Sequence, residues 1–126
     1  MSGLSVGDLM LDSPVYSLDD VEWNKVRPDI AINILSKSLL PKKWSNVKMV
    51  LTKVLPDGEF SDHIDNYHHV LLFLKGIGSV KVDDKEYEIS PNLVVEIPAG
   101  IKHSYKNKGK DELLLFTVNI PVSESK

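Results

Sequence analysis

The stretch GEFSDHIDNYHHVLLFLKGIGSV, residues 58–80, holds the most informative pattern in this chain. It places three histidines within seven positions, follows them with an apolar run from Val70 to Leu74, and closes with Gly76-Ile77-Gly78. A short run rich in β-branched and aromatic residues that ends in turn formers is typical of a β-strand. The stretch therefore predicts a histidine-bearing strand that ends in a glycine turn.

The same alternation of apolar run and turn extends in both directions from this stretch. Turn signals recur about every ten residues, which is typical of an antiparallel sandwich or barrel because each strand crosses the sheet once and reverses. The sequence thus predicts an all-β, antiparallel core. The further runs are Val47–Leu55, Ser79–Val82, Glu86–Ile89, Leu93–Ile97 and Glu112–Ile120, and they end at Pro56-Asp57-Gly58, Asp83-Asp84, Ser90-Pro91-Asn92, Pro98-Ala99-Gly100 and Pro121.

The first third of the chain is less regular. Leu18 to Val26 fits a short N-terminal helix with Ser17 as its N-cap, because acidic residues in its first turn complement the helix dipole. Ile30 to Leu35 alternates well enough to form an edge or swapped strand. We expect Trp23 and Trp44 to seal a barrel end or a subunit contact rather than to stack on a ligand.

Size, charge and composition exclude several classes of protein. A chain of 126 residues fits a single domain, 1–126, in which we expect residues 1–14 and 123–126 to be flexible. The net charge of −3, with both signs interspersed, lacks the basic stripe that binding to nucleic acid or to an anionic membrane requires. Without cysteine there are no disulfides, thiolate metal sites or cysteine nucleophiles. No signal-peptide pattern or membrane-length apolar run occurs, so we expect a cytoplasmic protein.

The histidines cluster in the second half of the chain. On a strand alternate side chains share a face, so His63 and Asp65 lie on one side and His69 has the same parity after a short turn. His68 has the opposite parity, and we interpret it as structural or facing solvent. His103 follows a separate turn and brings a further imidazole from another strand.

Such a cluster predicts a metal site. Neutral imidazoles bind divalent transition metals well, and a carboxylate beside them lowers the cost of burying the cation. His63, Asp65, His69 and His103 would make a set of three histidines and one carboxylate. Iron, manganese, nickel, cobalt, copper and zinc all remain open as the divalent transition metal ion.

Two segments resemble the motifs of the cupin superfamily. Residues 58–76 are similar to the first motif, a glycine, a histidine-x-histidine, a glutamate and a glycine, through Gly58, His63, Asp65, His69 and Gly76. The second motif, proline-x-glycine-x-x-histidine-x-x-x-asparagine, is matched by Pro98, Gly100, His103 and Asn107. The similarity extends from Leu55 to Ile120.

The resemblance implies a double-stranded β-helix, the jelly-roll barrel of small single-domain cupins. It also implies a metal-dependent enzyme, for which we expect a dioxygenase-type oxidoreductase acting on a small organic substrate. A lyase or isomerase, or a non-catalytic cupin that binds a sugar or other small molecule, are the alternatives. Small cupins commonly form homodimers by exchanging N-terminal segments, to which Ile30–Leu40 would contribute.

The sequence departs from the motifs at three positions. Asp65 stands where the first motif has its second histidine, and His69 stands where it has glutamate. Because aspartate is shorter than histidine, Asp65 could bind the metal directly, bind through a water, or act as an acceptor or base beside it. Asn92 stands where the second motif begins with glycine, a replacement that asparagine tolerates in the left-handed conformation.

Other residues have predicted roles around this site. Asp65 and Tyr105 are the candidate catalytic residues: Asp65 would handle protons, and Tyr105, which shares parity with His103, would donate a hydrogen bond to substrate or lie at the barrel mouth. The resemblance makes Asn107 a turn-stabilising residue. We expect Gly58, Gly76 and Gly100 to lie at chain reversals. Apolar residues that could shape the pocket, or simply pack the core, are Met49, Leu51, Leu71, Phe73 and Phe116.

Overall fold

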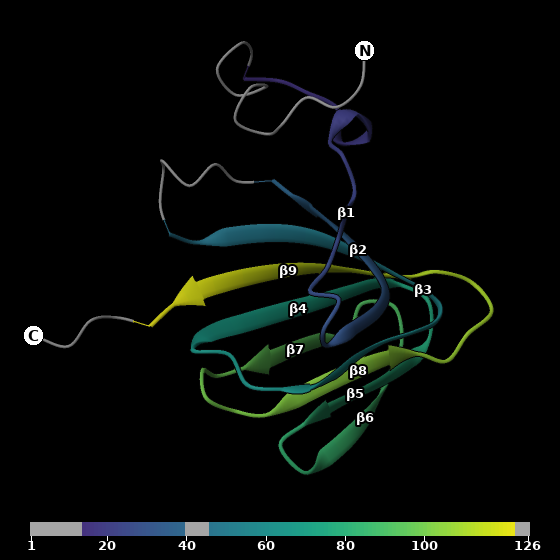
Figure 1. Cartoon of the computed structure of the whole chain (residues 1–126), viewed down its shortest axis with the longest axis vertical. Coiled ribbons are helices and arrows are strands. Elements are labelled where there is room, and N and C mark those ends of the chain that lie inside the picture. The colour runs from purple at the N-terminus through teal and green to yellow at the C-terminus, as the bar shows by residue number, and fades with distance from the viewer. Residues whose placement is uncertain (1–13, 40–45, 123–126) are drawn as a thin grey trace, which may run out of the picture.

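The computed structural model describes residues 14–39 and 46–122, and these residues are almost entirely β-sheet (Figure 1). One 3₁₀ turn, η1 (Leu18–Asp20), precedes the strands. The predicted all-β, antiparallel fold is confirmed. The strands are β1 (Asn24–Lys25), β2 (Ala31–Ser38), β3 (Lys48–His63), β4 (Tyr67–Lys75), β5 (Gly78–Val82), β6 (Lys85–Ile89), β7 (Val94–Ile97), β8 (His103–Asn107) and β9 (Leu113–Pro121).

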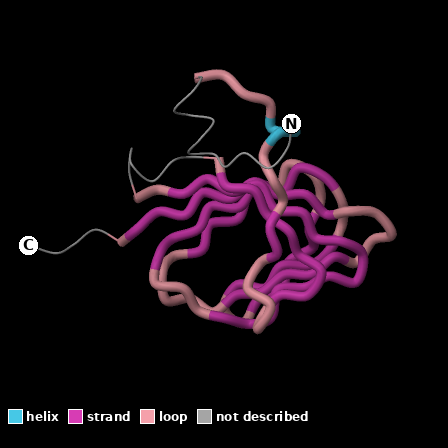
Figure 2. The backbone as a smooth tube through the Cα atoms, turned by 45° about the horizontal axis from the view of Figure 1, so that its top comes forward, coloured by secondary structure: helices cyan, strands magenta, loops and turns pink. Residues whose placement is uncertain are grey.

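The strands form one curled antiparallel sheet in the order β6-β5-β8-β3-β9-β4-β7, and β2 lies beside β3 with β1 on its far edge. Figure 2 shows how the curl brings the two ends of the sheet to face each other. One layer contains β9, β4 and β7, and the other contains β8, β5 and β6. Apolar side chains from both layers fill the space between them: Ala31, Ile34, Val54, Leu71, Phe73, Val80, Ile89, Ile97, Tyr105, Leu113 and Leu115.

Strand β3 connects the two layers, and here the predicted turn at Pro56-Asp57-Gly58 is wrong. The chain does not reverse: β3 pairs with β9 before this point and with β8 after it. Asp57 takes a φ of 67°, which bends the strand. Gly58 is needed for close approach, because a Cβ there would lie 2.9 Å from the carbonyl oxygen of Asn33 in β2 and 2.7 Å from the Val54 side chain.

The remaining turns follow their sequence signals. Gly76 and Gly100 have φ values of 98° and 87°, in the left-handed region that favours glycine. Asn92 has a φ of 74°, so the expected tolerance of asparagine at this position is confirmed. Each of these residues lies between two strands of different layers, so the chain crosses from one layer to the other at it.

The N-terminal segment is extended rather than helical, so the predicted helix from Leu18 to Val26 is wrong beyond its first turn. Ser17 does act as an N-cap, since its side chain accepts a hydrogen bond from the backbone N–H of Asp19. After Asp20 the chain runs along β2 as β1, because pairing with an open strand edge satisfies more backbone groups than a short exposed helix.

Trp23 fixes this segment to the outer face of the sheet. The ammonium groups of Lys37 and Lys53 lie 4.5 and 4.3 Å from the Trp23 ring centroid. Lys37 also donates a hydrogen bond of 2.8 Å to the carbonyl oxygen of Leu18. Trp23 thus packs against lysine side chains of β2 and β3, and its predicted role at a barrel end or a subunit contact stays a prediction. Trp44 lies outside the described residues, as do residues 1–13 and 123–126.

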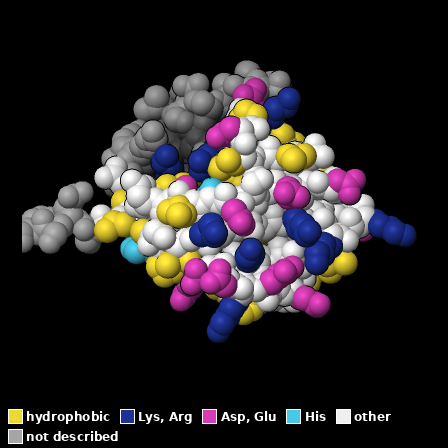
Figure 3. Space-filling view, turned by 60° about the horizontal axis from the view of Figure 1, so that its bottom comes forward, with side chains coloured by type: hydrophobic (Ala, Val, Ile, Leu, Met, Phe, Trp, Pro, Cys, Tyr) yellow, Lys and Arg dark blue, Asp and Glu magenta, His cyan; other side chains and the backbone are white. Residues whose placement is uncertain are grey.

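The strand predicted from Ile30 to Leu35 is confirmed as β2. Whether residues 30–40 also form a dimer contact stays a prediction. Positive and negative side chains are mixed over the face shown in Figure 3. Across the described ranges, no helix is both long and apolar enough to span a bilayer.

Candidate metal centre

Two histidines meet where β3 ends and β8 begins. His63 is the last residue of β3 and His103 the first of β8, and they are direct partners across the antiparallel pair. Their ring centroids are 4.2 Å apart. The register between β3 and β8 therefore brings together two imidazoles that are forty residues apart in the sequence.

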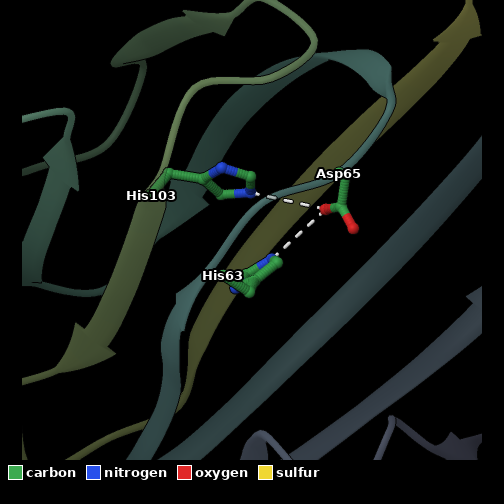
Figure 4. A group of neighbouring side chains, drawn as sticks. All are labelled: His63, Asp65 and His103. Carbon is green, nitrogen blue, oxygen red and sulfur yellow. Dashed lines mark ion pairs between the residues drawn. The ribbon is translucent and has the colours of Figure 1, made fainter.

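Asp65 reaches the same point from the loop between β3 and β4. Its carbonyl oxygen accepts a 2.9 Å hydrogen bond from the N–H of Gly100, which ties this loop to the turn before β8. Its side chain is 8% exposed, and its Oδ2 lies 3.3 Å from Nε2 of His63 and 3.6 Å from Nε2 of His103 (Figure 4). Nε2 of His69, on β4, lies 2.8 Å from the same oxygen.

The other nitrogen of each of the three rings is already engaged. Nδ1 of His63 lies 2.6 Å from the carbonyl oxygen of Ser61, and Nδ1 of His103 lies 2.9 Å from that of Ile101. Nδ1 of His69 lies 2.7 Å from the side-chain oxygen of Asn119. Because each partner is an oxygen acceptor, each Nδ1 carries the hydrogen.

This tautomer decides what the centre can hold. A neutral ring with its hydrogen on Nδ1 presents a lone pair at Nε2, and Oδ2 of Asp65 presents only lone pairs. Four acceptor atoms directed at one region repel one another unless a cation, either a proton or a metal ion, lies among them. Acceptor oxygens that orient histidine rings through Nδ1 are typical of metal-ligating imidazoles.

The separations also fit a metal ion. Ligand atoms about 2.1 Å from one ion are roughly 3.0 Å apart at octahedral angles and roughly 3.4 Å apart at tetrahedral angles. The ligand atoms of His63, Asp65 and His103 all lie within 4.8 Å of one another. His69 reaches Asp65 but is not part of that group, so its role as a direct ligand stays a prediction.

The charge states suit the same interpretation. Burial alone would raise the pKa of the Asp65 carboxyl, but the hydrogen bond with His69, the charges of His63 and His69 and the hydrogen bond from Arg27 outweigh it and hold that pKa below its ordinary value. Burial lowers the pKa of His103, and the neighbouring histidines lower it further. At neutral pH the centre therefore offers a charged carboxylate and a neutral imidazole at His103.

A cavity of about 130 Å³ opens onto the centre. Polar groups on its wall come from both layers and from the N-terminal segment, and the rest of the wall is apolar. Tyr105 lies on the wall, on the same side of β8 as His103, and its ring contacts Phe60 and Phe73 edge to face. The lining residues are Val26, Arg27, Ser36, Val50, Thr52, Phe60, His63, Asp65, Tyr67, His69, Leu71, His103, Tyr105, Thr117 and Asn119.

The sequence of the chain matches the family of the cupin domain over residues 50–119, which is more than half of its length. The chain belongs to the cupin family. The two cupin motifs predicted from the sequence thus lie in a chain whose membership is shown independently. No curated protein matches the sequence.

Solved cupin structures share the fold at low sequence identity. A predicted oxalate decarboxylase of Thermotoga maritima is 18% identical with a TM-score of 0.77, covering 86% of this chain and 99% of its own. A polyketide cyclase of Streptomyces resistomycificus is 19% identical with a TM-score of 0.75, covering 89% and 87%. A cupin-2 domain of Rhodospirillum rubrum is 17% identical with a TM-score of 0.74, covering 88% and 76%. These likenesses establish the fold of this cupin.

Two other residues in the region of the cupin motifs are structural, as predicted. Nδ1 of His68 accepts a 3.0 Å hydrogen bond from the N–H of Ala99, away from the centre. The amide of Asn107 donates to the carbonyl oxygens of Val54 and Asp111 and accepts from the N–H of Gly109, which holds the loop before β9.

The predicted apolar walls of the cavity are only partly correct. Leu71 lines the cavity, and Phe73 is fully buried in the core beside it. Met49, Leu51 and Phe116 do not line it, because their strand neighbours do and adjacent side chains point to opposite faces. Val50 and Thr52 on β3 take the cavity side, as does Thr117 on β9.

Sequence reasoning missed three residues of this centre. Arg27 donates to Oδ1 of Asp65 at 3.2 Å, and its one available signal is that it is the only arginine in the chain. Tyr67 shares strand parity with His69, and their ring centroids are 4.8 Å apart. Asn119 orients His69 from fifty residues away, and no local pattern marks it.

Ionisation of Tyr105 is expected to make the protein less stable at alkaline pH. Burial, and then the charge of Asp65, raise the pKa of the Tyr105 hydroxyl above its ordinary value. A raised folded-state pKa gives a stabilising contribution that is complete below the unfolded value of about 10 and is lost as the pH rises beyond it. We expect the free energy of unfolding to fall above pH 10 with a contribution from Tyr105 of about 1.4 kcal/mol per pH unit.

Urea unfolding of the wild type and of Tyr105→Phe at several pH values between 9 and 11 measures this contribution. The phenylalanine variant keeps the ring contacts and has no group to ionise, so its slope should be shallower. Parallel slopes for the two proteins would show that Tyr105 ionises normally.

Proposed function

We propose that this cupin is a metal-dependent enzyme, a dioxygenase-type oxidoreductase that acts on a small organic substrate. The observation that carries the proposal is the convergence of Nε2 of His63, Nε2 of His103 and Oδ2 of Asp65, each with a lone pair, on the wall of a cavity. A divalent cation among these atoms would satisfy all three lone pairs, and the cavity beside it leaves room for a reactant.

The residue types of the three candidate ligands favour a metal site that activates dioxygen. Two histidines and one carboxylate, with open positions, are the ligand set typical of non-haem iron(II) oxygenases. His63, Asp65 and His103 would hold the ion, with His69 as a further ligand or as the partner of Asp65. A bound ion of this kind supplies Lewis-acid and redox chemistry.

The residues of the chain would bind and orient the substrate. Arg27 and Tyr67 are at the cavity wall, where a guanidinium and a phenol can face substrate oxygens. Tyr105 keeps its proton at neutral pH because its pKa is raised, so it can donate a hydrogen bond but cannot act as a base. Asp65 stays a charged carboxylate at neutral pH because its pKa is lowered, so it would act as a ligand or hydrogen-bond acceptor and only as a weak base.

The cavity limits the size of the substrate. Its volume of about 130 Å³ is close to that of an engineered protein cavity of roughly 150 Å³ that holds benzene. We infer a substrate of about the size of a benzene ring, with oxygen atoms that can chelate a metal. A small 1,3-diketone in its enol form has both properties, as does a short carboxylic acid.

A lyase that acts on a small acid is the second candidate. It is supported by the likeness in fold to a predicted oxalate decarboxylase and by the same chelating centre. Both candidates need the metal, but only the dioxygenase consumes dioxygen, both atoms of which enter the substrate. The third candidate is a cupin that binds small molecules without catalysis, and it needs neither the metal nor dioxygen.

The first test is metal analysis of protein purified without added metal, where we expect near-stoichiometric transition metal. The second is oxygen uptake by the iron(II) form with small 1,3-diketones and short carboxylic acids, in air and under nitrogen. Uptake of one dioxygen per substrate consumed supports the dioxygenase. Turnover that persists under nitrogen favours the lyase, and an intact fold that takes up no metal contradicts both.

A further inference from the structure

Arg27 links the N-terminal segment to the metal centre. Its NH1 donates to Oδ1 of Asp65 at 3.2 Å, while the other carboxylate oxygen, Oδ2, faces the three histidine rings. The two oxygens of Asp65 are thus used for different purposes. Arg27 is the only arginine among the fifteen basic side chains of Lys and Arg in the sequence.

The backbone around Arg27 is held in place on both sides. The N–H of Val26 donates to the carbonyl oxygen of Ile34 in β2 at 3.1 Å. The carbonyl oxygen of Arg27 accepts from the N–H of Ile30 and of Ala31 at 3.0 and 2.9 Å. Pro28 follows directly and restricts the backbone of the residue before it. Arg27 therefore starts from a fixed position, although its side chain is 48% exposed.

The same turn also contacts a second ligand of the centre. The carbonyl oxygen of Ile30 accepts a 2.8 Å hydrogen bond from the N–H of Ser61, and the carbonyl oxygen of Ser61 orients Nδ1 of His63. The turn from Arg27 to Ala31 is thus linked to Asp65 through a side chain and to His63 through one peptide group. Two of the three grouped ligand residues depend on it for their position.

We propose that Arg27 is a positioning residue of the metal centre: by occupying Oδ1 of Asp65, it leaves Oδ2 as the single oxygen that this carboxylate presents to the ion. The inference rests on the proposed metal-dependent function and adds the N-terminal turn, which lies before the matched residues 50–119, to the centre. A free carboxylate can turn about its side-chain bonds or bind an ion with both oxygens. The ion pair removes that freedom.

The test compares binding of Co²⁺ to the wild type, Arg27→Gln and Arg27→Lys, followed by the visible absorption of the bound cobalt. Loss of a residue that orients a ligand typically lowers metal affinity by about 10–100-fold, and we expect a loss in this range for Arg27→Gln. The cobalt absorption bands should shift as well, because a released Asp65 changes the coordination. Arg27→Lys should recover part of the affinity, since an ammonium keeps the charge but lacks the planar fork.

Lys25→Gln is the matched control, because it removes an exposed positive charge two residues away on the same segment. It should bind Co²⁺ as the wild type does. On an Asp65→Asn background, Arg27→Gln should have no further effect, because Arg27 acts through Asp65.

The outcomes for Arg27 and for the metal function are distinguishable. Wild-type affinity and absorption in a folded Arg27→Gln protein would overturn the role of Arg27 and leave the metal function intact. Equal losses from Arg27→Gln in the wild-type and in the Asp65→Asn background would overturn it too. So would an Arg27→Gln protein that no longer has the circular dichroism spectrum of the wild type, because Arg27 would then act on the fold. Absence of Co²⁺ binding by the wild type would instead remove the proposed metal function, and the inference with it.

Discussion

His103→Gln is expected to weaken the binding of a divalent transition metal by about two to three orders of magnitude. Structural zinc sites with four ligands bind with about 10–16 kcal/mol, or roughly 2.5–4 kcal/mol per ligand, and each 1.4 kcal/mol is a factor of ten. His103 is 3% exposed and its Nδ1 is fixed by the carbonyl oxygen of Ile101, so its Nε2 is held at a point that a glutamine side chain does not reproduce. Competition titration with a chromophoric chelator measures the change.

His68→Gln provides the control for this prediction. His68 is a histidine next to His69 on β4, but its ring faces away from the centre and accepts a hydrogen bond from Ala99. A glutamine can accept the same bond, and metal affinity should stay within a factor of about two or three. Equal losses from the two variants would mean that His103 acts on the fold and not on the ion.

Phe73→Ala is expected to lower the free energy of unfolding by about 3–5 kcal/mol. The Phe73 side chain is fully buried at the centre of the core, where its ring packs edge to face on Tyr105. Removing it loses the apolar transfer energy and leaves a cavity that β4 and β9, paired along their length, cannot close. A decrease of about 10–20 °C in the melting temperature should follow for a chain of this size.

Thermal unfolding of Leu74→Ala measures the background for this loss. Leu74 is the next residue on β4, faces the opposite side of the sheet and is 40% exposed. Its replacement should cost about 1 kcal/mol or less. If Leu74→Ala were as damaging as Phe73→Ala, the core would not lie between the two layers.

The sequence was sufficient to predict most strands and to identify which histidines lie together at the candidate site. Glycine and asparagine mark three of the turns because few other residues adopt a positive φ, and Gly76, Asn92 and Gly100 do so here. The partnership of His63 and His103 follows from strands that end and begin at these residues. Local sequence patterns were therefore enough to predict those residues of the centre that lie on strands.

Long-range contacts account for the errors. Pro56-Asp57-Gly58 has the composition of a reversal, and only the contact between Gly58 and the backbone of Asn33 shows why the strand continues through it. The helix predicted from Leu18 was outweighed by pairing of β1 with β2. Parity along β3 was ambiguous because apolar residues occur on both faces, so its cavity side could not be chosen before its partners were known.

The contribution of Arg27 could not be predicted from the sequence for a similar reason. The residue acts across thirty-eight positions, through a carboxylate that the sequence placed in the centre for other reasons. Its rarity in a lysine-rich chain is a weak signal, since a single arginine on a surface is common. Only the folded chain shows that the guanidinium lies against Asp65.

The continuity of β3 determines how small molecules exchange with the interior. One strand pairs with β9 along its first part and with β8 along its second, so the two layers cannot separate without breaking the pairing of that strand with a partner. Small molecules would then enter and leave on a side of the cavity where the half-exposed side chain of Arg27 forms part of the wall. Entry and exit by this route would make residence time in the interior sensitive to the N-terminal turn even when the catalytic chemistry is unchanged.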